Sequence, residues 1–227
     1  MIKTLYEQLS EDIRIQEGLK ACINCGTCTA VCPAAEFYDY DPRCIVDTVQ
    51  NGDEAEIEKL LRSDAIWYCG ECMSCVSRCP RTNAPGLIII ALRALSQELG
   101  YFTDSEKGRQ QLILKRVIGE NFILKKGYCI YVRDLSYEKH PEAGPVWQWL
   151  NKNADSMFKR LGANLDGDGV GVLRKIPQED LDEIKKIFDV TGGTERFEKI
   201  EKYSAKKAEE MGLTMDEYID RHYTGKQ

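Results

Sequence analysis

Residues 22–33 read CINCGTCTAVCP, and residues 69–80 read CGECMSCVSRCP. Both stretches space their cysteines as C-x2-C-x2-C-x3-C and end in proline, which is the spacing of ferredoxins that bind [4Fe-4S] clusters. Together they hold eight of the ten cysteines of the chain. Three cysteines spaced by two residues wrap a short loop around one cubane and present three thiolates to three irons. The sequence therefore predicts two [4Fe-4S] clusters.

The fourth cysteine of each stretch lies beyond that loop, so it points away and ligates the other cluster. We therefore expect two crossed ligand sets. The first cluster uses Cys22, Cys25, Cys28 and Cys79, and the second uses Cys69, Cys72, Cys75 and Cys32. A protein with this arrangement is expected to transfer electrons.

Two other uses of cysteine fit this chain less well. A disulfide framework belongs to oxidising compartments and small secreted domains, whereas this chain has 227 residues and residues 1–20 lack the apolar core of a signal peptide. A zinc site pairs one C-x2-C with a second pair a dozen or more residues away. Here the four thiols of each stretch fall close together, so zinc or a degraded site is the weaker alternative.

The segment between the two stretches favours helices over the short strands of small β-type ferredoxins. Apolar residues recur at helical spacing over residues 42–50, where Pro42 can open the helix. They recur again over residues 54–61, where Asp53 can cap the helix. A third apolar stripe follows the second stretch, over residues 87–100. We therefore predict a mainly α protein, with an α-helical ferredoxin domain over residues 1–100 that holds both clusters between helices.

Residues 101–227 are not needed for cluster binding, and their patterns are mostly helical. Thr103 to Glu106 resembles a capping box, and residues 122–124 and 128–132 could form a small hairpin. Further helices are expected over residues 145–161, with Trp147, Leu150 and Phe158 inward, over residues 177–188, and after a capping box at Thr214 to Glu217. Because apolar density is modest and no catalytic constellation is visible, we interpret this region as a helical docking extension.

Several features suggest sites but are better explained otherwise. Asn164 to Gly169 resembles the start of a calcium loop, but Lys175 occupies the twelfth position, where a bidentate Glu is needed, so a tight turn is expected. Trp67 and Tyr68 precede Cys69 and could shield a cluster from water. The remaining candidates are isolated side chains, interpreted as two surface histidines and two small packing thiols: His140, His222, Cys44 and Cys129.

The composition excludes some classes of partner. The net charge of -6 becomes more negative once thiolate-bound clusters form, which disfavours nucleic acid and favours a basic protein surface. The longest apolar run, residues 86–92, is far too short to span a bilayer. We expect a cytoplasmic protein with no integral membrane segment.

The residues around the cysteines also carry a family resemblance. Besides residues 22–33, the matching stretches are YDPR at 40–43, SDAIWYC at 63–69, CPR at 79–81 and ALR at 91–93. Over roughly residues 15–100, the chain resembles the C subunit of heterodisulfide reductase. The resemblance implies a helical ferredoxin protein that relays electrons between two partners of that complex. One is the flavin-binding A subunit, and the other is the cysteine-rich B subunit, where thiol–disulfide chemistry occurs.

The tail refines that resemblance. Its length departs from the short methanogen form and is similar to the heterodisulfide-reductase-like complexes of sulfur oxidisers, whose substrate is protein-bound sulfur. This implies a place in sulfur metabolism.

Two other functions stay open at this point. Glycolate oxidase, glycerol-3-phosphate dehydrogenase and succinate dehydrogenase use similar helical ferredoxin modules, so the chain could be the iron–sulfur subunit of another flavin-dependent dehydrogenase. Alternatively, the metal could merely hold the fold of a structural module. An independent enzyme is not expected, because no nucleophile–base pair, flavin motif or open metal site is visible. We therefore predict a non-catalytic electron-transfer subunit of an oxidoreductase complex.

Overall fold

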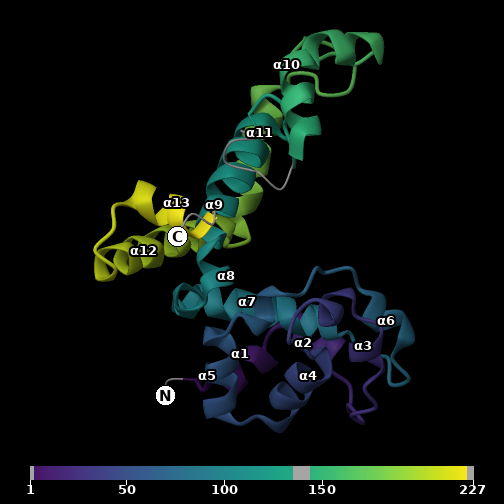
Figure 1. Cartoon of the computed structure of the whole chain (residues 1–227), viewed down its shortest axis with the longest axis vertical. Helices are drawn as coiled ribbons and strands as arrows, with labels where there is room; N and C mark the ends of the chain where they lie inside the picture. The colour runs from purple at the N-terminus through teal and green to yellow at the C-terminus, as the bar shows by residue number, and fades with distance from the viewer. Residues whose placement is uncertain (1–2, 135–143, 224–227) are drawn as a thin grey trace. The chain divides into compact units, whose positions relative to one another are not determined.

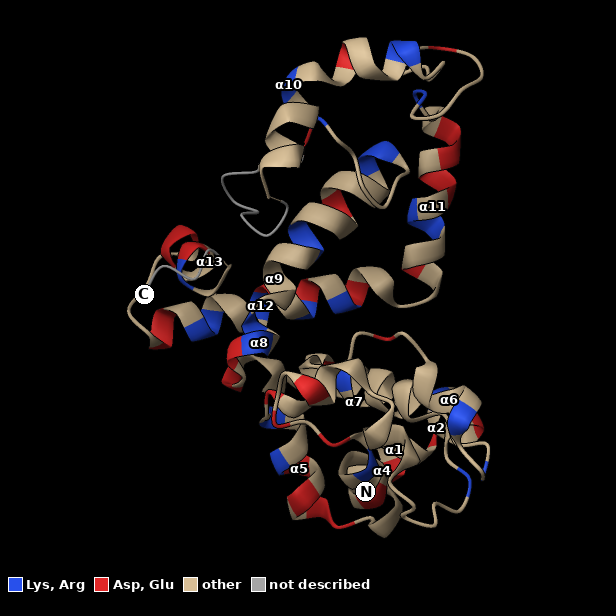
Figure 2. Ribbon diagram, turned by 45° about the vertical axis from the view of Figure 1, so that its right-hand side comes forward, with Lys and Arg blue, Asp and Glu red and all other residues tan. Residues whose placement is uncertain are grey.

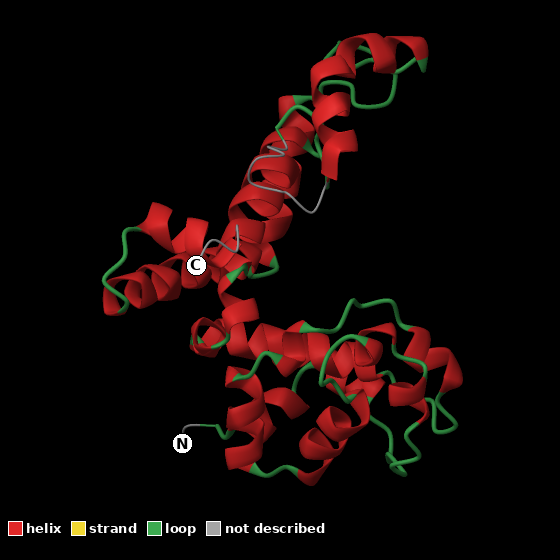
Figure 3. Ribbon diagram, viewed as in Figure 1, coloured by secondary structure: helices red, strands yellow, loops and turns green. Residues whose placement is uncertain are grey.

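The computed structural model describes residues 3–134 and 144–223, and within these ranges it contains helices and loops but no strand (Figure 3). This confirms the mainly α prediction. The chain divides into two compact units, Met1–Arg109 and Gln110–Gln227, coloured purple to teal and teal to yellow in Figure 1. In the described ranges, no helix combines the length and apolar character needed to cross a membrane.

The first unit consists of short helices around one long helix, α7. In chain order they are α1 (Leu5–Ser10), α2 (Ile13–Gly18), α3 (Thr27–Ala30), η1 (Pro33–Glu36), α4 (Pro42–Asn51), α5 (Glu54–Arg62), η2 (Ala65–Trp67), α6 (Ser74–Arg78), α7 (Pro85–Leu99), η3 (Tyr101–Asp104) and α8 (Glu106–Arg109). Helices α2, α4 and α5 all pack against α7.

The two helices between the cysteine motifs begin and end as the sequence predicts. The Asp41 side chain accepts hydrogen bonds from the first backbone N–H groups of α4, Pro42 is the first helical residue, and Gly52 ends the helix at a φ of 70°. Asp53 caps α5 in the same way. Their apolar faces meet α7 in a core where Val49, Ile57 and other side chains are fully buried. Each such burial stabilises the fold by about 1.5–3 kcal/mol.

Residues 101–109 pack with the first unit. Phe102 is fully buried, and the Ser105 hydroxyl donates a hydrogen bond of 2.5 Å to Asp64. The expected cap at Thr103 is wrong, because the Thr103 hydroxyl bonds back to Gly100. Ser105 caps α8 instead, by accepting the N–H of Gly108 at 2.9 Å.

The second unit is also built of helices within its described residues. They are α9 (Gln111–Leu114), η4 (Lys115–Leu124), α10 (Gly144–Arg160), α11 (Gln178–Val190), α12 (Gly193–Glu210) and α13 (Met215–Tyr223). Figure 2 shows Lys and Arg interspersed with Asp and Glu along α12, where Lys199 pairs with Glu195 at 2.7 Å, one helical turn apart.

The hairpin expected near residue 125 is wrong. Residues 115–124 form a π-helix, whose buried positions Lys115, Gly119 and Phe122 recur at helical rather than strand spacing. Gly119 is required there, because a Cβ atom would collide with the ring of Phe197 on α12.

Other expectations for the second unit have mixed outcomes. The capping box of α13 is confirmed, since the Thr214 N–H donates to Glu217 at 2.8 Å and the Glu217 N–H donates to the Thr214 hydroxyl at 3.3 Å. On α10, the side chains expected inward are only half-buried, and Ala154 is the buried residue. His222 is not a surface residue: it is buried against Tyr218, 4.6 Å between ring centroids. His140 lies outside the described residues.

Candidate iron–sulfur centre

The eight motif cysteines line two separate cavities in the first unit. One cavity is lined by Cys22, Cys25, Cys28 and Cys79, and the other by Cys69, Cys72, Cys75 and Cys32. Each cavity thus receives three thiols from one motif and a fourth thiol from the other motif. These are the two sets that the sequence predicts, and four thiols around one cavity fit the ligand set of a [4Fe-4S] cluster.

The two motifs also have the same backbone conformation. The residue before the second cysteine has a positive φ in both, 60° at Asn24 and 55° at Glu71, and so has the residue after it, Gly26 or Met73. The N–H of Asn24 approaches Cys22 Sγ at 3.4 Å, and the N–H of Glu71 approaches Cys69 Sγ at 3.4 Å. Such strained loops persist only when they are over-determined, and here they turn backbone donors toward sulfur.

Two helices cover the cavities at equivalent positions. Arg43 and Val46 of α4 line the first cavity, whereas Gly86 and Ile89 of α7 line the second. A Cβ atom at Gly86 would lie 2.7 Å from the sulfur of Met73. The absence of a side chain at Gly86 therefore leaves room for the Met73 side chain between α7 and the loop of the second motif.

One polar side chain anchors the start of each motif. Gln50 on α4 accepts the N–H of Cys22 at 2.6 Å and donates to its carbonyl at 3.3 Å. Arg93 on α7 donates to the carbonyl of Cys69 at 2.6 Å and to that of Ile66 at 2.6 Å, and pairs with Glu71 at 2.6 Å. Both motifs are thereby tied to the helices of the core.

The thiol pKa values follow the same repeat. Hydrogen bonds with the Thr27 hydroxyl lower the pKa of Cys25, and hydrogen bonds with the Ser74 hydroxyl lower the pKa of Cys72. Burial raises the pKa of the third cysteine of each motif, Cys28 and Cys75. Metal binding requires the thiolate, which these hydrogen bonds favour at the exposed second cysteine of each motif and which burial disfavours at the partly buried third.

The surroundings of the two cavities differ. Arg43 and Arg81 line the first cavity, whereas Tyr40 lines the second. Tyr40 is 4% exposed, and burial, followed by the charge of the Cys69 thiolate and hydrogen bonding to it, raises the pKa of its hydroxyl well above the ordinary value. Tyr40 was not predicted as a site residue. The signal that could have found it is its place two residues before Pro42, which matches the place of Asn83 two residues before Pro85.

The other candidates from the sequence contribute less. Neither Trp67 nor Tyr68 is among the described residues that line the two cavities, although Tyr68 stacks on Tyr38 at 4.4 Å beside the second motif. Cys44 and Cys129 are exposed, so their interpretation as buried packing thiols is wrong. Within residues 3–134 and 144–223, no three Cys, His, Asp or Glu side chains are close enough to hold a single metal ion.

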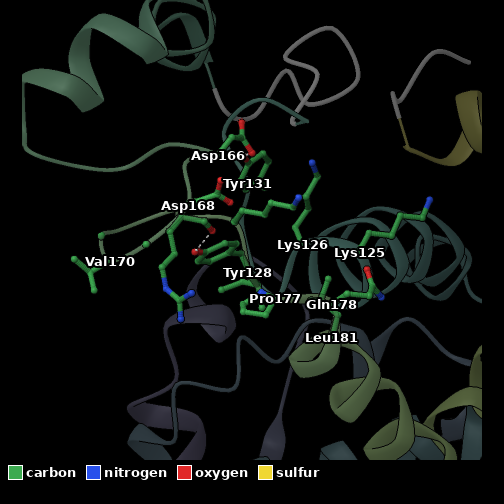
Figure 4. Close-up of a pocket in the computed structure, with 15 residues that line it drawn as sticks. Lys125, Lys126, Tyr128, Tyr131, Asp166, Asp168, Val170, Pro177, Gln178 and Leu181 are labelled. Carbon is green, nitrogen blue, oxygen red and sulfur yellow. Dashed lines mark hydrogen bonds between the residues drawn. The ribbon is translucent and has the colours of Figure 1, made fainter.

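The second unit contains a cleft of its own, of about 890 Å³ (Figure 4). Lys126, Tyr128 and Tyr131 line one part of it, and residues 166–181 line the rest. Tyr128 donates to the Arg174 carbonyl at 2.8 Å, and Tyr131 bonds to Asp166. The neighbouring loop is the tight turn that the sequence predicts, since Asn164 Nδ2 donates to the Asp168 carbonyl at 2.8 Å.

Fold and cysteine arrangement together define a helical ferredoxin-type iron–sulfur protein. A family described as "4Fe-4S dicluster domain" matches residues 18–83, which include all eight motif cysteines. The C subunit of the ferredoxin:CoB-CoM heterodisulfide reductase of Methanosarcina acetivorans is 44% identical over 216 residues, covering 93% of this chain and 76% of that protein. The chain belongs to the family of heterodisulfide reductase C subunits, as the resemblance implied.

Two further relatives agree with that membership. The C 2 iron-sulfur subunit of the CoB--CoM heterodisulfide reductase of Methanocaldococcus jannaschii is 35% identical over 154 residues, covering 66% of this chain and 74% of that protein. The C2 subunit of the H(2)/formate:CoB-CoM heterodisulfide,ferredoxin reductase of Methanococcus maripaludis is 29% identical over 156 residues, covering 66% of this chain and 77% of that protein.

The comparison corrects one inference from the sequence. The match to the Methanosarcina protein spans 93% of this chain, so it extends far into residues 101–227. A similar tail therefore also occurs in a methanogen, whereas the matches to the Methanocaldococcus and Methanococcus proteins cover only 66% of this chain.

Proposed function

We propose that this chain binds two [4Fe-4S] clusters in the crossed arrangement and relays electrons within a cytoplasmic heterodisulfide-reductase complex. The observation that carries the proposal is the pair of four-cysteine cavities. The clusters supply one-electron redox chemistry when bound. The protein's own task is to hold eight thiolates in place and to keep the two sets close together.

The crossing itself keeps the two sets close. Cys28 belongs to the first set and Cys32 to the second, and only three residues at the end of α3 separate them. Cys75 and Cys79 are related in the same way along α6. Four residues span at most about 14 Å even when fully extended, so each of these segments bridges both sets, and α3 and α6 lie side by side (Figure 1). This spacing favours electron transfer between the clusters.

The proposed partners are a flavin-binding protein, which delivers electrons, and a cysteine-rich protein, which uses them on a disulfide. The relatives are named for a CoB-CoM heterodisulfide, and we propose a substrate of that kind for the complex. A role in sulfur oxidation, with protein-bound sulfur as the substrate, is the alternative, but the tail does not favour it because a methanogen relative matches 93% of this chain.

We also propose that the second unit is an assembly element. Its helices expose large apolar side chains, among them Val146, Trp149 and Val190, at 72%, 52% and 84%. Exposed apolar patches on a helical surface mark interaction sites. Helices with few fully buried residues also gain stability by packing on a partner.

The test of the cluster proposal is iron analysis with EPR on the full chain purified without oxygen. We expect about eight irons per chain, as two cubanes, and reversible reduction of both. Four irons per chain, or two tightly bound zinc ions without redox activity, would contradict the proposal and favour a structural module.

A second experiment addresses the partners. Anaerobic co-expression with candidate flavin-binding and cysteine-rich proteins, followed by purification through a tag on this chain, should recover both. Recovery of a glycolate, glycerol-3-phosphate or succinate dehydrogenase flavoprotein instead would assign the chain to that other class.

A further inference from the structure

The second cysteine cavity contains a tyrosine that has no equivalent in the first. Tyr40 lies two residues before Pro42, the first residue of α4, and Asn83 lies two residues before Pro85, the first residue of α7. Tyr40 lines the second cavity and Asn83 lines the first. The same structural position therefore carries different side chains at the two cavities.

The two side chains direct their polar groups differently. Asn83 is buried and uses its Oδ1 atom to accept the N–H of Lys20 at 2.5 Å. Tyr40 instead lines the second cavity together with Cys69. The ring of Tyr68 meets the Tyr40 ring edge-on at a centroid distance of 6.3 Å, and burial to 4% exposure keeps the phenol protonated and in place.

We propose that the Tyr40 hydroxyl donates a hydrogen bond to the Cys69 thiolate and thereby raises the reduction potential of the second cluster. The inference rests on the proposed assignment of Cys69 to that cluster. Reduction adds one electron, taken from the external reductant, and leaves the phenol proton on Tyr40. Because the reduced cluster is the more negative state, a donor to its sulfur stabilises it more than the oxidised state.

The donors within the two cysteine loops are alike. The N–H of Glu71 reaches Cys69 Sγ at 3.4 Å, but the N–H of Asn24 reaches Cys22 Sγ at the same 3.4 Å. Thr27 and Ser74 likewise make equivalent contacts with Cys25 and Cys72. These four contacts are alike in the two sets. Beyond them, the first set has the N–H of Asn83, which donates to Cys79 Sγ at 3.3 Å, and the second set has Tyr40.

The test is an EPR-monitored redox titration of the full chain with both clusters loaded. In Tyr40→Phe, which keeps the ring and removes the hydroxyl, one of the two midpoint potentials should fall. We expect a decrease of about tenfold in the equilibrium constant for reduction, which is about 59 mV for a one-electron couple. The other midpoint potential should stay unchanged.

Two variants serve as controls. Tyr38→Phe removes a hydroxyl from a ring that is 49% exposed and stacks on Tyr68, so neither potential should move. Arg81→Gln removes a cation that lines the first cavity and should lower the potential that Tyr40→Phe leaves unchanged. Together the variants assign each potential to a cavity.

The outcomes separate this inference from the proposed function. Two intact clusters with unchanged potentials in Tyr40→Phe, or an equal shift in Tyr38→Phe, would overturn the role of Tyr40 and leave the relay in place. A wild-type chain with a single cluster would overturn both. If Tyr40→Phe loses iron, fluorotyrosine, whose hydroxyl is a stronger donor, replaces tyrosine in the full chain instead. This replacement should raise the midpoint potential of the second cluster, and an unchanged potential would overturn the inference.

Discussion

Arg93 and Cys69 are joined by a hydrogen bond of 2.6 Å from the guanidinium Nη2 to the backbone carbonyl. The same guanidinium holds the Ile66 carbonyl and the Glu71 carboxylate, and its side chain is only 15% exposed. A bidentate, planar cation can satisfy several acceptors at fixed angles, which lysine cannot. Arg93 therefore fixes the loop that presents the first thiol of the second motif.

Replacing Arg93 should weaken the second cluster more than the first. Arg93→Gln removes the charge and leaves two carbonyls and a carboxylate without their donor, at a cost of about 2–4 kcal/mol. Iron content should fall toward half under mild chelation, and only one EPR signal should remain. Arg93→Lys, the charge-conserving control, should restore part of the iron; full recovery would show that charge alone suffices.

The crossed ligand sets predict which cluster each fourth cysteine serves. Cys32→Ala should damage the cluster held by Cys69, Cys72 and Cys75, because Cys32 lines their cavity. Cys79→Ala is the matched variant and should damage the other cluster. The two clusters are distinguished by their midpoint potentials, which the Tyr40→Phe and Arg81→Gln variants assign to the two cavities. Loss of the Cys22 cluster in Cys32→Ala would mean that the sets are not crossed.

Gly86 offers a steric test of the second cavity. A Cβ atom there would lie 2.7 Å from Met73 Sδ, so Gly86→Ala must displace the Met73 side chain, which lines the second cavity. We expect a loss of stability of about 1–3 kcal/mol and a lower occupancy of the second cluster by iron analysis. Gly70→Ala is the control, because Gly70 also lines this cavity but its Cβ would meet nothing within 4 Å.

Local rules predicted the first unit well because its signals lie in neighbouring residues. Asp41, Pro42 and Gly52 define the start and end of α4 through short-range hydrogen bonds and fixed backbone angles. The role of Tyr40 is different. Its hydroxyl reaches Cys69, far along the chain, and only the folded backbone brings them together. The family resemblance supplied the identity of the complex, which spacing alone could not.

The second unit shows where such rules fail. The apolar segments 122–124 and 128–132 on either side of Lys125 to Gly127 suggested a hairpin, but Phe122 continues the buried stripe of Lys115 and Gly119. Because a charged residue, Lys115, occupies a buried position of that stripe, the helical spacing of its buried residues is hard to recognise from the sequence. Lys115 is buried because Glu201 and Glu120 pair with its ammonium at 2.8 and 2.9 Å, and those partners could not be foreseen from the local sequence.

The pairing of Glu201 predicts a pH dependence for the second unit. Burial by itself would raise the pKa of Glu201, but hydrogen bonds and charges from Arg116 and Lys115 outweigh it and hold the pKa below the ordinary value. Because the pKa of Glu201 is lower in the folded than in the unfolded protein, its carboxylate stabilises the fold at pH values above the unfolded-state pKa, which is near 4.3. That stability is lost as the pH falls through the lower native pKa. The hydrogen-exchange protection factors of α12, which correct for the intrinsic pH dependence of exchange, should therefore fall between about pH 5 and pH 3.

The matched variant removes this dependence. Glu201→Gln should lose about 1–3 kcal/mol at pH 7 and show a flatter pH profile in the same exchange measurement. Glu195→Gln, which breaks an exposed pair with Lys199, should leave the profile of α12 unchanged. An equally steep profile in Glu201→Gln would assign the acid sensitivity to other carboxylates.

The last prediction concerns the second unit as an assembly element. All eight motif cysteines lie within Met1–Arg109, a compact unit with its own buried core, so a chain ending at Arg109 should keep both clusters. If residues 110–227 hold the partners, the truncated chain should bind about eight irons but fail to recover the flavin-binding and cysteine-rich proteins in a pull-down.

A point variant tests the same proposal in the full chain. Trp149 is 52% exposed on α10, and an exposed aromatic side chain is a frequent anchor at interfaces. Trp149→Ala should weaken capture of a partner about tenfold or more without changing iron content, whereas Lys152→Ala, on the same helix, should have little effect. Loss of the clusters on truncation would show that the second unit completes the fold of the first, and undiminished partner binding would rule out docking through this unit.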